Sequence, residues 1–307
     1  MSKGSLFFGN ASGKLGQVVL TTVKGQQIAR AWQPKVANPR TSSQQTQRAK
    51  FANAVKFYRR ATSNLFKFAF EDKRKTESDY NAFMRHNVDK AMIVNRASYD
   101  NIAYPAIGYN WLMSAGSLGN VAPAVDGELD QRVTFSQVEF IGTKEPEALT
   151  VADVSQSFIL RLGAVDGDYV TVVAVNASIK KINDKPSALP DWNIVQFRID
   201  TTDSERKLLD IFNEQKDGNW GATITKIDSS NYITATNMSG SVWMAVILSR
   251  VTTNGVLVST SDLVGSKVSN DIFNASLQLG YRSAALNSWD RQSEAILKGA
   301  IYKESSL

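Results

Sequence analysis

The sequence has no cysteine and a single histidine, His86. Without cysteine the chain forms no disulfide, no thiolate zinc site and no cysteine nucleophile, and its composition suits a reducing cytosol. One histidine excludes a multi-histidine metal site, and the composition makes the partners of a histidine-based triad scarce. We therefore expect His86 to be a surface or helix-packing residue.

Long hydrophobic runs are also missing. No window approaches the roughly 18 apolar residues that mark a membrane span. The segment from Met1 to Val19 has no run of seven or more apolar residues behind a basic flank, so we expect no signal peptide and no membrane partner. The apolar fraction of 43% still suffices for a folded core.

Acidic residues are absent from the first 70 positions, which hold twelve Lys or Arg; the first acid is Glu71. The remaining 237 residues hold 23 basic and 29 acidic side chains, so a head of charge +12 precedes a body of charge −6. Such a one-sided segment repels itself and becomes easier to order when a polyanion or an acidic protein surface neutralises it. This asymmetry points to binding or assembly.

The head begins with a polar segment, residues 1–12, that we interpret as an extended arm. Residues 15–23 and 26–32 are β-rich and flank Lys24-Gly25, which is a hairpin signal. Prolines 34 and 39 then predict an extended connector.

Two helices follow in the prediction. The first starts at Thr41 or Ser42, each of which fits a capping box, and runs to about Phe70. The second runs from Ser78 to about Val94, and a short charged turn between them favours an antiparallel pair. The residues expected to face inward on the two helices are Phe51, Val55, Tyr58, Thr62, Leu65, Ala69, Tyr80, Met84, Val88 and Ala91 or Met92.

Short β runs dominate after residue 131. The strands are predicted at 132–141, 156–163, 168–178, 193–200, 221–227, 231–236, 241–251 and 255–260, with a helix at 203–214 and turn signals between most strands, among them Asn183 to Pro190. This spacing is typical of an antiparallel β-sandwich or jelly roll. The fold class is therefore α+β. The predicted domains are a basic N-terminal hairpin and helical module (1–97), a packed linker (98–130), a β-sandwich (131–265) and a C-terminal extension (266–307).

The motifs that carry chemistry are weak. The segment from Gly9 to Lys14 resembles part of a phosphate loop, but it has one residue too few between its glycines, Leu15 stands where a hydroxyl is needed, and a strand is expected where a helix should follow. The acidic groups Asp126, Glu128 and Asp130, and Asp166 with Asp168, lack calcium-loop spacing and fit solvated turns better than a cation site or a glycosidase pair. No G-x-S-x-G elbow occurs. We expect no catalysis and no cofactor.

The basic helix face and hairpin are the best functional candidates, because an ordinary solvated surface mixes charges of both signs. Lysine and arginine that neutralise phosphates bind without sequence preference and lose affinity with salt. The predicted polyanion or assembly surface is Lys14, Lys24, Arg30, Lys35, Arg40, Arg48, Lys56, Arg59, Arg60 and Lys67.

One stretch resembles a known family. The pattern runs Gly13-Lys14-x-Gly16-x-Val18, a hairpin ending at Arg30, Pro34-Lys35, Asn38-Pro39-Arg40-Thr41 and then Gln44-x-x-Gln47-Arg48-x-x-Phe51. It resembles an uncharacterised family of gut-type bacteria and their bacteriophages, which has a basic N-terminal module and a variable β-rich C-terminal part. A weaker likeness lies at 243–260. The resemblance implies a particle-associated role and no assigned reaction.

We therefore expect a bacteriophage virion structural protein, made in the host cytoplasm and assembled in many copies with itself and other virion proteins. Its basic surface would contact the packaged DNA or an acidic neighbouring subunit. Capsid, portal-proximal, tail and fibre positions all remain open. The alternatives are a nucleic-acid-binding protein outside any particle, and a carbohydrate-binding β-sandwich with exposed aromatics at 99–111, Trp220 or Trp243.

Overall fold

The structure is a computed structural model. It describes residues 12–23, 26–33, 47–48, 50–51, 54–55, 57–59, 61, 65–89, 111–125, 132–141, 144–182, 185–215, 221–236 and 241–265. The chain divides into two compact units, Met1–Thr41 and Ser42–Leu307. Within the second unit, helical residues that precede position 97 share a hydrophobic cluster with strands that follow position 131.

The first unit contains a three-stranded antiparallel sheet in the order β1-β2-β3. Its strands are β1 (Gly13–Leu15), β2 (Val18–Val23) and β3 (Gln26–Ala31). The β2–β3 hairpin is confirmed, with Val23 opposite Gln26. The β-rich run predicted at 15–23 is a strand from Val18 to Val23, but it is interrupted before that, because the chain turns at Gly16-Gln17 and pairs Leu15 with Val18. Gly16 has φ +59°, a left-handed conformation that favours glycine.

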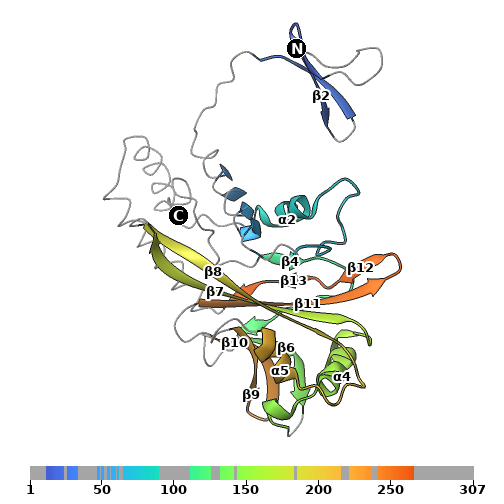
Figure 1. The fold of residues 1–307 in the computed structure, drawn as a ribbon, viewed down its shortest axis with the longest axis vertical. Coiled ribbons are helices and arrows are strands. Elements are labelled where there is room, and N and C mark those ends of the chain that lie inside the picture. The colour runs from blue at the N-terminus through green and yellow to red at the C-terminus, as the bar shows by residue number, and fades with distance from the viewer. Residues whose placement is uncertain are drawn as a thin grey trace, which may run out of the picture. The chain divides into compact units, whose positions relative to one another are not determined.

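A long antiparallel sheet organises the second unit, in the order β12-β11-β7-β8, with β14 also paired to β11. Figure 1 shows β7, β8 and β11 crossing the middle of this unit. The strands are β7 (Tyr169–Ile182), β8 (Lys185–Arg198), β11 (Ser241–Thr252), β12 (Gly255–Val258) and β14 (Val264–Gly265).

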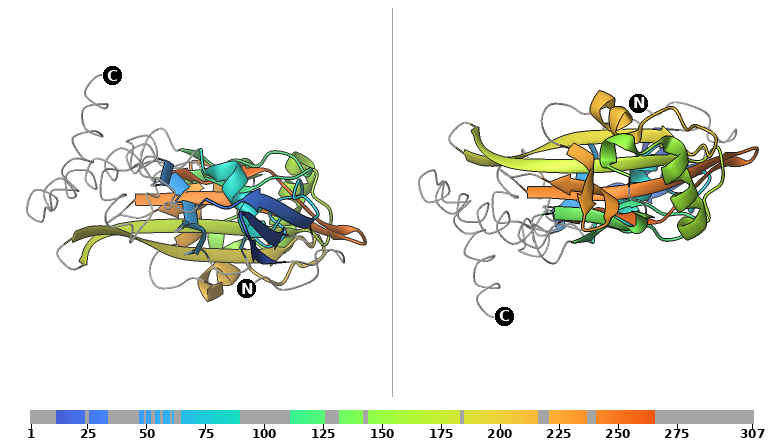
Figure 2. Two further views of the ribbon diagram at one scale, coloured as in Figure 1. Left: turned by 90° about the horizontal axis from the view of Figure 1, so that it is seen from above. Right: turned by 90° about the horizontal axis from the view of Figure 1, so that it is seen from below.

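Both faces of β11 are buried, which explains its almost continuous apolar sequence. Val242, Met244, Val246 and Leu248 belong to one hydrophobic cluster. Trp243, Ala245 and Ile247, which alternate with them, belong to another. Because successive side chains of a strand point to opposite faces, the long sheet separates two cores. The view from below in Figure 2 shows helices and shorter strands lying across these long strands.

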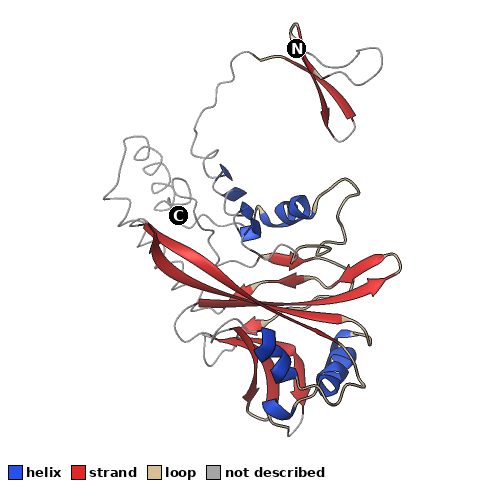
Figure 3. Cartoon of the chain, in the orientation of Figure 1, coloured by secondary structure: helices blue, strands red, loops and turns tan. Residues whose placement is uncertain are grey.

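The first cluster lies between the long sheet, a four-stranded antiparallel sheet and two helices. The four-stranded sheet has the order β5-β6-β10-β9. Figure 3 shows both helices on the same side of the long strands as this sheet. The elements are β5 (Ala124–Val125), β6 (Arg132–Ile141), β9 (Gly221–Ile227), β10 (Ser230–Thr236), α4 (Val151–Leu162) and α5 (Leu208–Gln215), with a 3₁₀ turn η1 at Pro146–Ala148.

The second cluster covers the opposite face of the long sheet. It joins the helical residues Ala54 and Phe57, the turn around Phe66, and the helix α2 (Asp79–Asn87). A two-stranded sheet, β4 (Leu112–Ser114) with β13 (Ser261–Asp262), packs here too. Phe57 stacks on Trp111 with ring centroids 4.5 Å apart. The packing expected for the linker therefore holds at Trp111, which is fully buried.

The inward stripe predicted for the first helix is partly wrong. Phe51 is 50% exposed, whereas Ala54, Phe57 and Ala61 are buried. The described residues between 47 and 59 are helical, but residues 65–68 form a turn, so the helix does not reach Phe70. The prediction placed the inward face one residue too far along the helix, at Val55 and Tyr58, which are half-buried.

The second helix begins as predicted, since the Ser78 hydroxyl accepts a hydrogen bond from Asn81 N at 3.2 Å. It ends at Asn87, seven residues before the predicted end at Val94. Ala82, Phe83, Met84 and Asn87 are its buried residues, while Tyr80 and Val88 are half-buried.

The strand predicted at 156–163 is wrong, because this segment lies in helix α4. Thr150 and Asp153 form a reciprocal capping box, with Thr150 N donating to Asp153 Oδ2 at 3.0 Å. Gly163, at φ +65°, ends the helix. Leu160 is 84% exposed, so the apolar run that suggested a strand is divided between the buried and exposed faces of a helix.

The turn predicted from Asn183 to Pro190 is also wrong. β8 begins at Lys185, and Pro186 and Pro190 pair with Lys181 and Ala177. β8 is the last strand of its sheet, where a residue without an N–H is tolerated on the unpaired side.

The remaining predicted strands and the helix at 203–214 match β6, β7, β9–β12 and α5 within a few residues at most of their ends. The fold is mixed α+β with mostly antiparallel sheets. Among the described helices none is long and apolar enough to cross a membrane. The predicted arm, the connector and the segments 98–110 and 266–307 lie outside the described residues, except for Ser12 and the connector's first positions.

Candidate functional site

The small sheet of the first unit has one basic, aromatic face. Lys14 pairs with Val19 across β1 and β2, and Val19 pairs with Arg30 across β2 and β3. Directly paired residues of an antiparallel sheet point to the same face, so Lys14 and Arg30 flank Val19 on one surface. Trp32 lies two residues after Arg30 and so points to the same face. The Lys14 ammonium lies 3.0 Å from the centre of the Trp32 ring.

All three of these side chains are exposed, with Trp32 at 42%. An ammonium over an indole face is a cation–π contact worth about 0.5–1 kcal/mol at an exposed site. We call Lys14, Arg30 and Trp32 the basic face. It presents two cations and one flat aromatic surface to solvent, which are the groups that bind phosphates and stack on bases.

The opposite face of this sheet is apolar and small. Leu15, Val18 and Ala31 lie in one row across the three strands, and Leu20 pairs with Ala29 beside them. Leu20 is the one large apolar side chain of this described sheet that is buried, while Leu15 is 52% exposed. The basic face also carries Val23 and Ile28, which are 50% and 44% exposed, so apolar side chains lie on both faces and the sheet has almost no core of its own.

The structure brings only part of the predicted surface together. Arg48 and Arg59 are exposed on the helical stretch of the second unit. Lys67 lies in the turn at 65–68. The other predicted residues lie outside the described ones: Lys24, Lys35, Arg40, Lys56 and Arg60.

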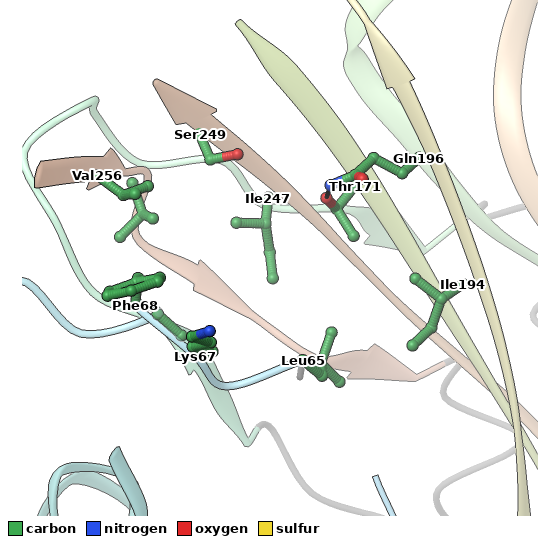
Figure 4. Close-up of a pocket in the computed structure, with 11 residues that line it drawn as sticks. Leu65, Lys67, Phe68, Thr171, Ile194, Gln196, Ile247, Ser249 and Val256 are labelled. Atoms are coloured by element: carbon green, nitrogen blue, oxygen red, sulfur yellow. Dashed lines mark hydrogen bonds between the residues drawn. The ribbon is translucent and has the colours of Figure 1, made fainter. Parts of the chain in front are cut away.

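Lys67 borders a hollow of about 270 Å³ on the face of the long sheet that carries the second cluster. Figure 4 shows the turn residues Leu65, Lys67 and Phe68 on one side of this space and the strand residue Ile247 on the other. We call it the sheet hollow. Its lining residues are Leu65, Lys67, Phe68, Ala69, Thr171, Ile194, Gln196, Ile247, Ser249, Val256 and Val258.

The hollow lies where the cover of the long sheet ends. Along β11, Trp243 and Ala245 are fully buried, Ile247 is 6% exposed and Ser249 is half-buried. The covering segment is anchored by backbone bonds at this margin: Ala115 N donates to Ala69 O, and Glu71 N donates to Ala115 O, both at 2.9 Å.

Phe68 holds an unusual conformation beside the hollow. Its φ is +62°, in the left-handed region that costs a non-glycine residue about 1–2 kcal/mol. Its ring is 50% exposed although Phe66 and Ala69 on either side are buried. The fixed positions of these neighbours hold the turn, and Phe68 stays at the rim with Lys67 Nζ 5.4 Å from its ring centre.

Polar groups gather at one edge of the hollow. Gln196 Nε2 donates to Thr171 Oγ1 at 3.0 Å. Gln196 is itself held by Gln215, whose Nε2 donates to the Gln196 carbonyl at 3.0 Å and whose Oε1 accepts from Gln196 N at 2.8 Å. Ser249 Oγ also lines this edge and donates to Tyr169 O at 3.5 Å.

The single histidine is a helix-packing residue, as predicted. The His86 ring stacks on Phe70 with centroids 5.1 Å apart, and its Nε2 lies 3.0 Å from Asp72 Oδ2. Arg85 Nη1 also donates to Asp72 Oδ2, at 2.7 Å, and Arg85 Nε donates to Glu77 at 3.2 Å. The hydrogen bond from Arg85 is the main reason that the pKa of Asp72 lies below its ordinary value.

The turn aspartates are structural, and the expectation that Asp168 is merely solvated is wrong. Asp168 is 1% exposed and forms a two-point pair with Arg250, at 2.8 Å from both Nε and Nη2. It also accepts from Val165 N at 2.9 Å. Asp166 accepts from Thr201 N and Oγ1. These bonds fix the connection from α4 to β7, and the partners lie too far along the chain for spacing to reveal them.

The other chemical motifs remain without a site. Lys14 lies in strand β1, so no helix follows the phosphate-loop-like segment at the position that a phosphate loop requires. In the described part of the chain no three His, Asp or Glu side chains gather as metal ligands. Residues 126–130, with their three acids, lie outside the described residues. Trp111 and Trp243 are fully buried, so neither is available to stack on a sugar.

Sequence reasoning missed the sheet hollow. Its residues come from the turn at 65–69 and from four strands that span 171–258, and no short motif links them. The one available signal was the polar break after the apolar run of β11, where Ser249 follows Leu248.

The chain matches no curated protein and no solved structure. Residues 10–128 match the model of one protein family, a range that holds the basic face, the turn with Lys67 and Phe68, α2 and β4. Over these residues the chain is similar to a family of unknown function (DUF6266).

Proposed function

We propose that the protein is a structural component of a bacteriophage particle, assembled in many copies in the host cytoplasm, and that its basic face binds a polyanion there. The observation that carries this proposal is the placement of Lys14, Arg30 and Trp32 on one exposed face of a sheet within an acid-free segment. The phage setting rests on the sequence resemblance over residues 9–70.

The physical case begins with charge. No acid within the first 70 residues can neutralise the basic face from its own segment. Each cation that meets a phosphate releases a condensed counterion, so binding is sequence-independent and weakens steeply with salt. Trp32 adds a stacking surface that every base can use. Packaged DNA and the acidic surface of a neighbouring subunit both meet these requirements.

A charge-matched pair of variants tests the face. Lys14→Gln with Arg30→Gln removes two positive charges from the basic face. Thr22→Glu with Ala31→Glu changes the net charge by the same amount on the opposite face, as the strand register places both residues there. We expect the first variant to lower the slope of log affinity against log salt for duplex DNA by about 1.8. The second should change it much less.

A second experiment distinguishes DNA from an acidic protein surface as the polyanion. Residues 71–307 carry a net charge of −6, so another copy of the chain is itself an acidic candidate. Light scattering at low and high salt measures whether oligomers form and whether Lys14→Gln with Arg30→Gln dissolves them. DNA binding and oligomerisation that are both unchanged in this variant would refute the proposed role of the face.

The finer fold assignment is part of the same proposal. We infer a β-sandwich in which the four-stranded sheet faces the long sheet, and the shared membership of both sheets in the first cluster supports this arrangement. The antiparallel helix pair stays a prediction, supported by the common cluster of Phe57 and the α2 residue Phe83, whose rings stack with centroids 6.1 Å apart.

A further inference from the structure

We propose that the sheet hollow binds a small monocarboxylate with an aliphatic chain of medium length. This goes beyond the polyanion role of the basic face and uses different residues. The floor of the hollow is aliphatic, with Ile194, Ile247, Val256 and Val258 contributed by three strands of the long sheet. Such a floor favours a hydrocarbon chain, since burying each CH₂ group contributes about 0.8 kcal/mol.

The charge of the lining selects the head group. Lys67 is the only charged residue among the eleven that line the hollow, and the hollow has no acidic lining residue. In the described part of the chain, Lys67 forms no ion pair with an acid. An anionic head beside Lys67 therefore gains a charge-assisted bond, whereas a cationic head is repelled.

The Thr171 hydroxyl offers the carboxylate a further hydrogen-bond donor. Thr171 Oγ1 accepts a hydrogen bond from Gln196, so its own hydrogen is available as a donor toward the hollow. The Gln215 brace holds Gln196 in place. One carboxylate has two oxygens and can accept from such a hydroxyl or from an ammonium. Lys67 on the turn side and Thr171 on the strand side are two donors among the residues that line the hollow.

The volume limits the length of the ligand. The hollow of about 270 Å³ is many times larger than the ~10–15 Å³ that one water molecule needs. It therefore has room for a chain of medium length, for which an eight-carbon acid is the probe, and a sixteen-carbon acid is the probe of a chain that extends past the lining residues. The Phe68 ring borders the space on the turn side.

Isothermal titration calorimetry of the full chain with octanoate, octanol, octylamine and hexadecanoate tests the proposal. We expect octanoate to bind more tightly than the other three. Lys67→Met keeps the apolar stem and removes the charge, and it should weaken octanoate binding by roughly tenfold or more while leaving octanol unchanged. Lys75→Met, an exposed lysine that does not line the hollow, is the matched control and should bind octanoate as the unaltered chain does.

A filling variant separates the hollow from any other surface. Val256→Trp on β12 should abolish binding of both octanoate and octanol, with an unchanged far-UV circular dichroism spectrum as evidence of folding. Equal affinity for octanoate and octylamine, octanoate binding that survives Val256→Trp, or an absence of binding to the folded chain would each overturn the proposal. The DNA affinity of Lys14→Gln with Arg30→Gln is an independent readout, so either proposal can fail alone.

Discussion

Asp168 and Arg250 form an ion pair in the second unit, and the loss of stability should depend on which of the two is replaced. Asp168 is 1% exposed, whereas the Arg250 side chain is 28% exposed. Removing the arginine leaves a buried carboxylate whose remaining hydrogen bond comes from the uncharged backbone N–H of Val165. Removing the charge of the aspartate leaves a guanidinium that water can still reach. The damage should therefore depend on which partner is lost.

The magnitudes follow from the two exposures. Breaking a buried pair by removing one partner costs about 3–5 kcal/mol, and we expect Arg250→Met to fall in this range. Asp168→Asn keeps an acceptor and frees a partly hydrated cation, so we expect about 1–2 kcal/mol, near the net value of one hydrogen bond to a charged group. The double variant should cost less than the sum of the two, because the uncompensated carboxylate is then absent.

Urea unfolding followed by tryptophan fluorescence measures these free energies. The control is Lys144→Met, which breaks an exposed pair with Asp153 whose side chains are 51% and 32% exposed; it should cost less than about 1 kcal/mol. Additive single variants, or an Arg250→Met that costs no more than Lys144→Met, would refute the reasoning. The same result would remove the claim that the turn after α4 is held by this pair.

Three further outcomes are expected. Phe57→Ala should lower the free energy of unfolding by about 3–5 kcal/mol, since the ring is fully buried against Trp111; chemical denaturation measures it, and a loss below about 1 kcal/mol contradicts the packing. Thr150→Ala should cost about 1 kcal/mol through loss of the α4 cap, and an unchanged unfolding midpoint would argue against the capping box. The pKa of Asp72 is lower in the folded chain than in the unfolded one, mainly through Arg85, so its contribution is present above about pH 4 and is lost as the pH falls through the folded value. Asp72→Asn should remove this part of the acid sensitivity in unfolding curves at pH 6 and pH 3, and an unchanged difference between the two pH values would contradict it.

The sequence predicted those parts of the fold whose signals are local. Val23 and Gln26 meet across the expected hairpin, and the β-rich runs after residue 131 form strands at most of the expected places. The mistake at α4 had a local remedy, because Thr150 followed by Asp153 is itself a capping signal. β8 needed more, since its two prolines are compatible with a strand only at a sheet edge, and edge position is a tertiary property.

The candidate sites divide in the same way. Lys14 and Arg30 could be chosen from composition, but their shared face depends on a turn at Gly16 that was not predicted. The sheet hollow could not be predicted, because Lys67 and Thr171 come to line the same space only after two layers have packed. The distribution of charge along a chain can be read from the sequence, whereas a space between layers exists only in the folded molecule.

The alternation along β11 has a consequence for insertions and deletions. Adding or removing one residue directly before Trp243 would send its indole toward the side that now receives Met244, and every later side chain of the strand would exchange sides with its neighbour. Because both sides are filled, neither exchange could be absorbed by solvent. Length variation in this unit should therefore be confined to loops such as the one joining β11 to β12, and the strand itself should tolerate changes of residue type far better than changes of length.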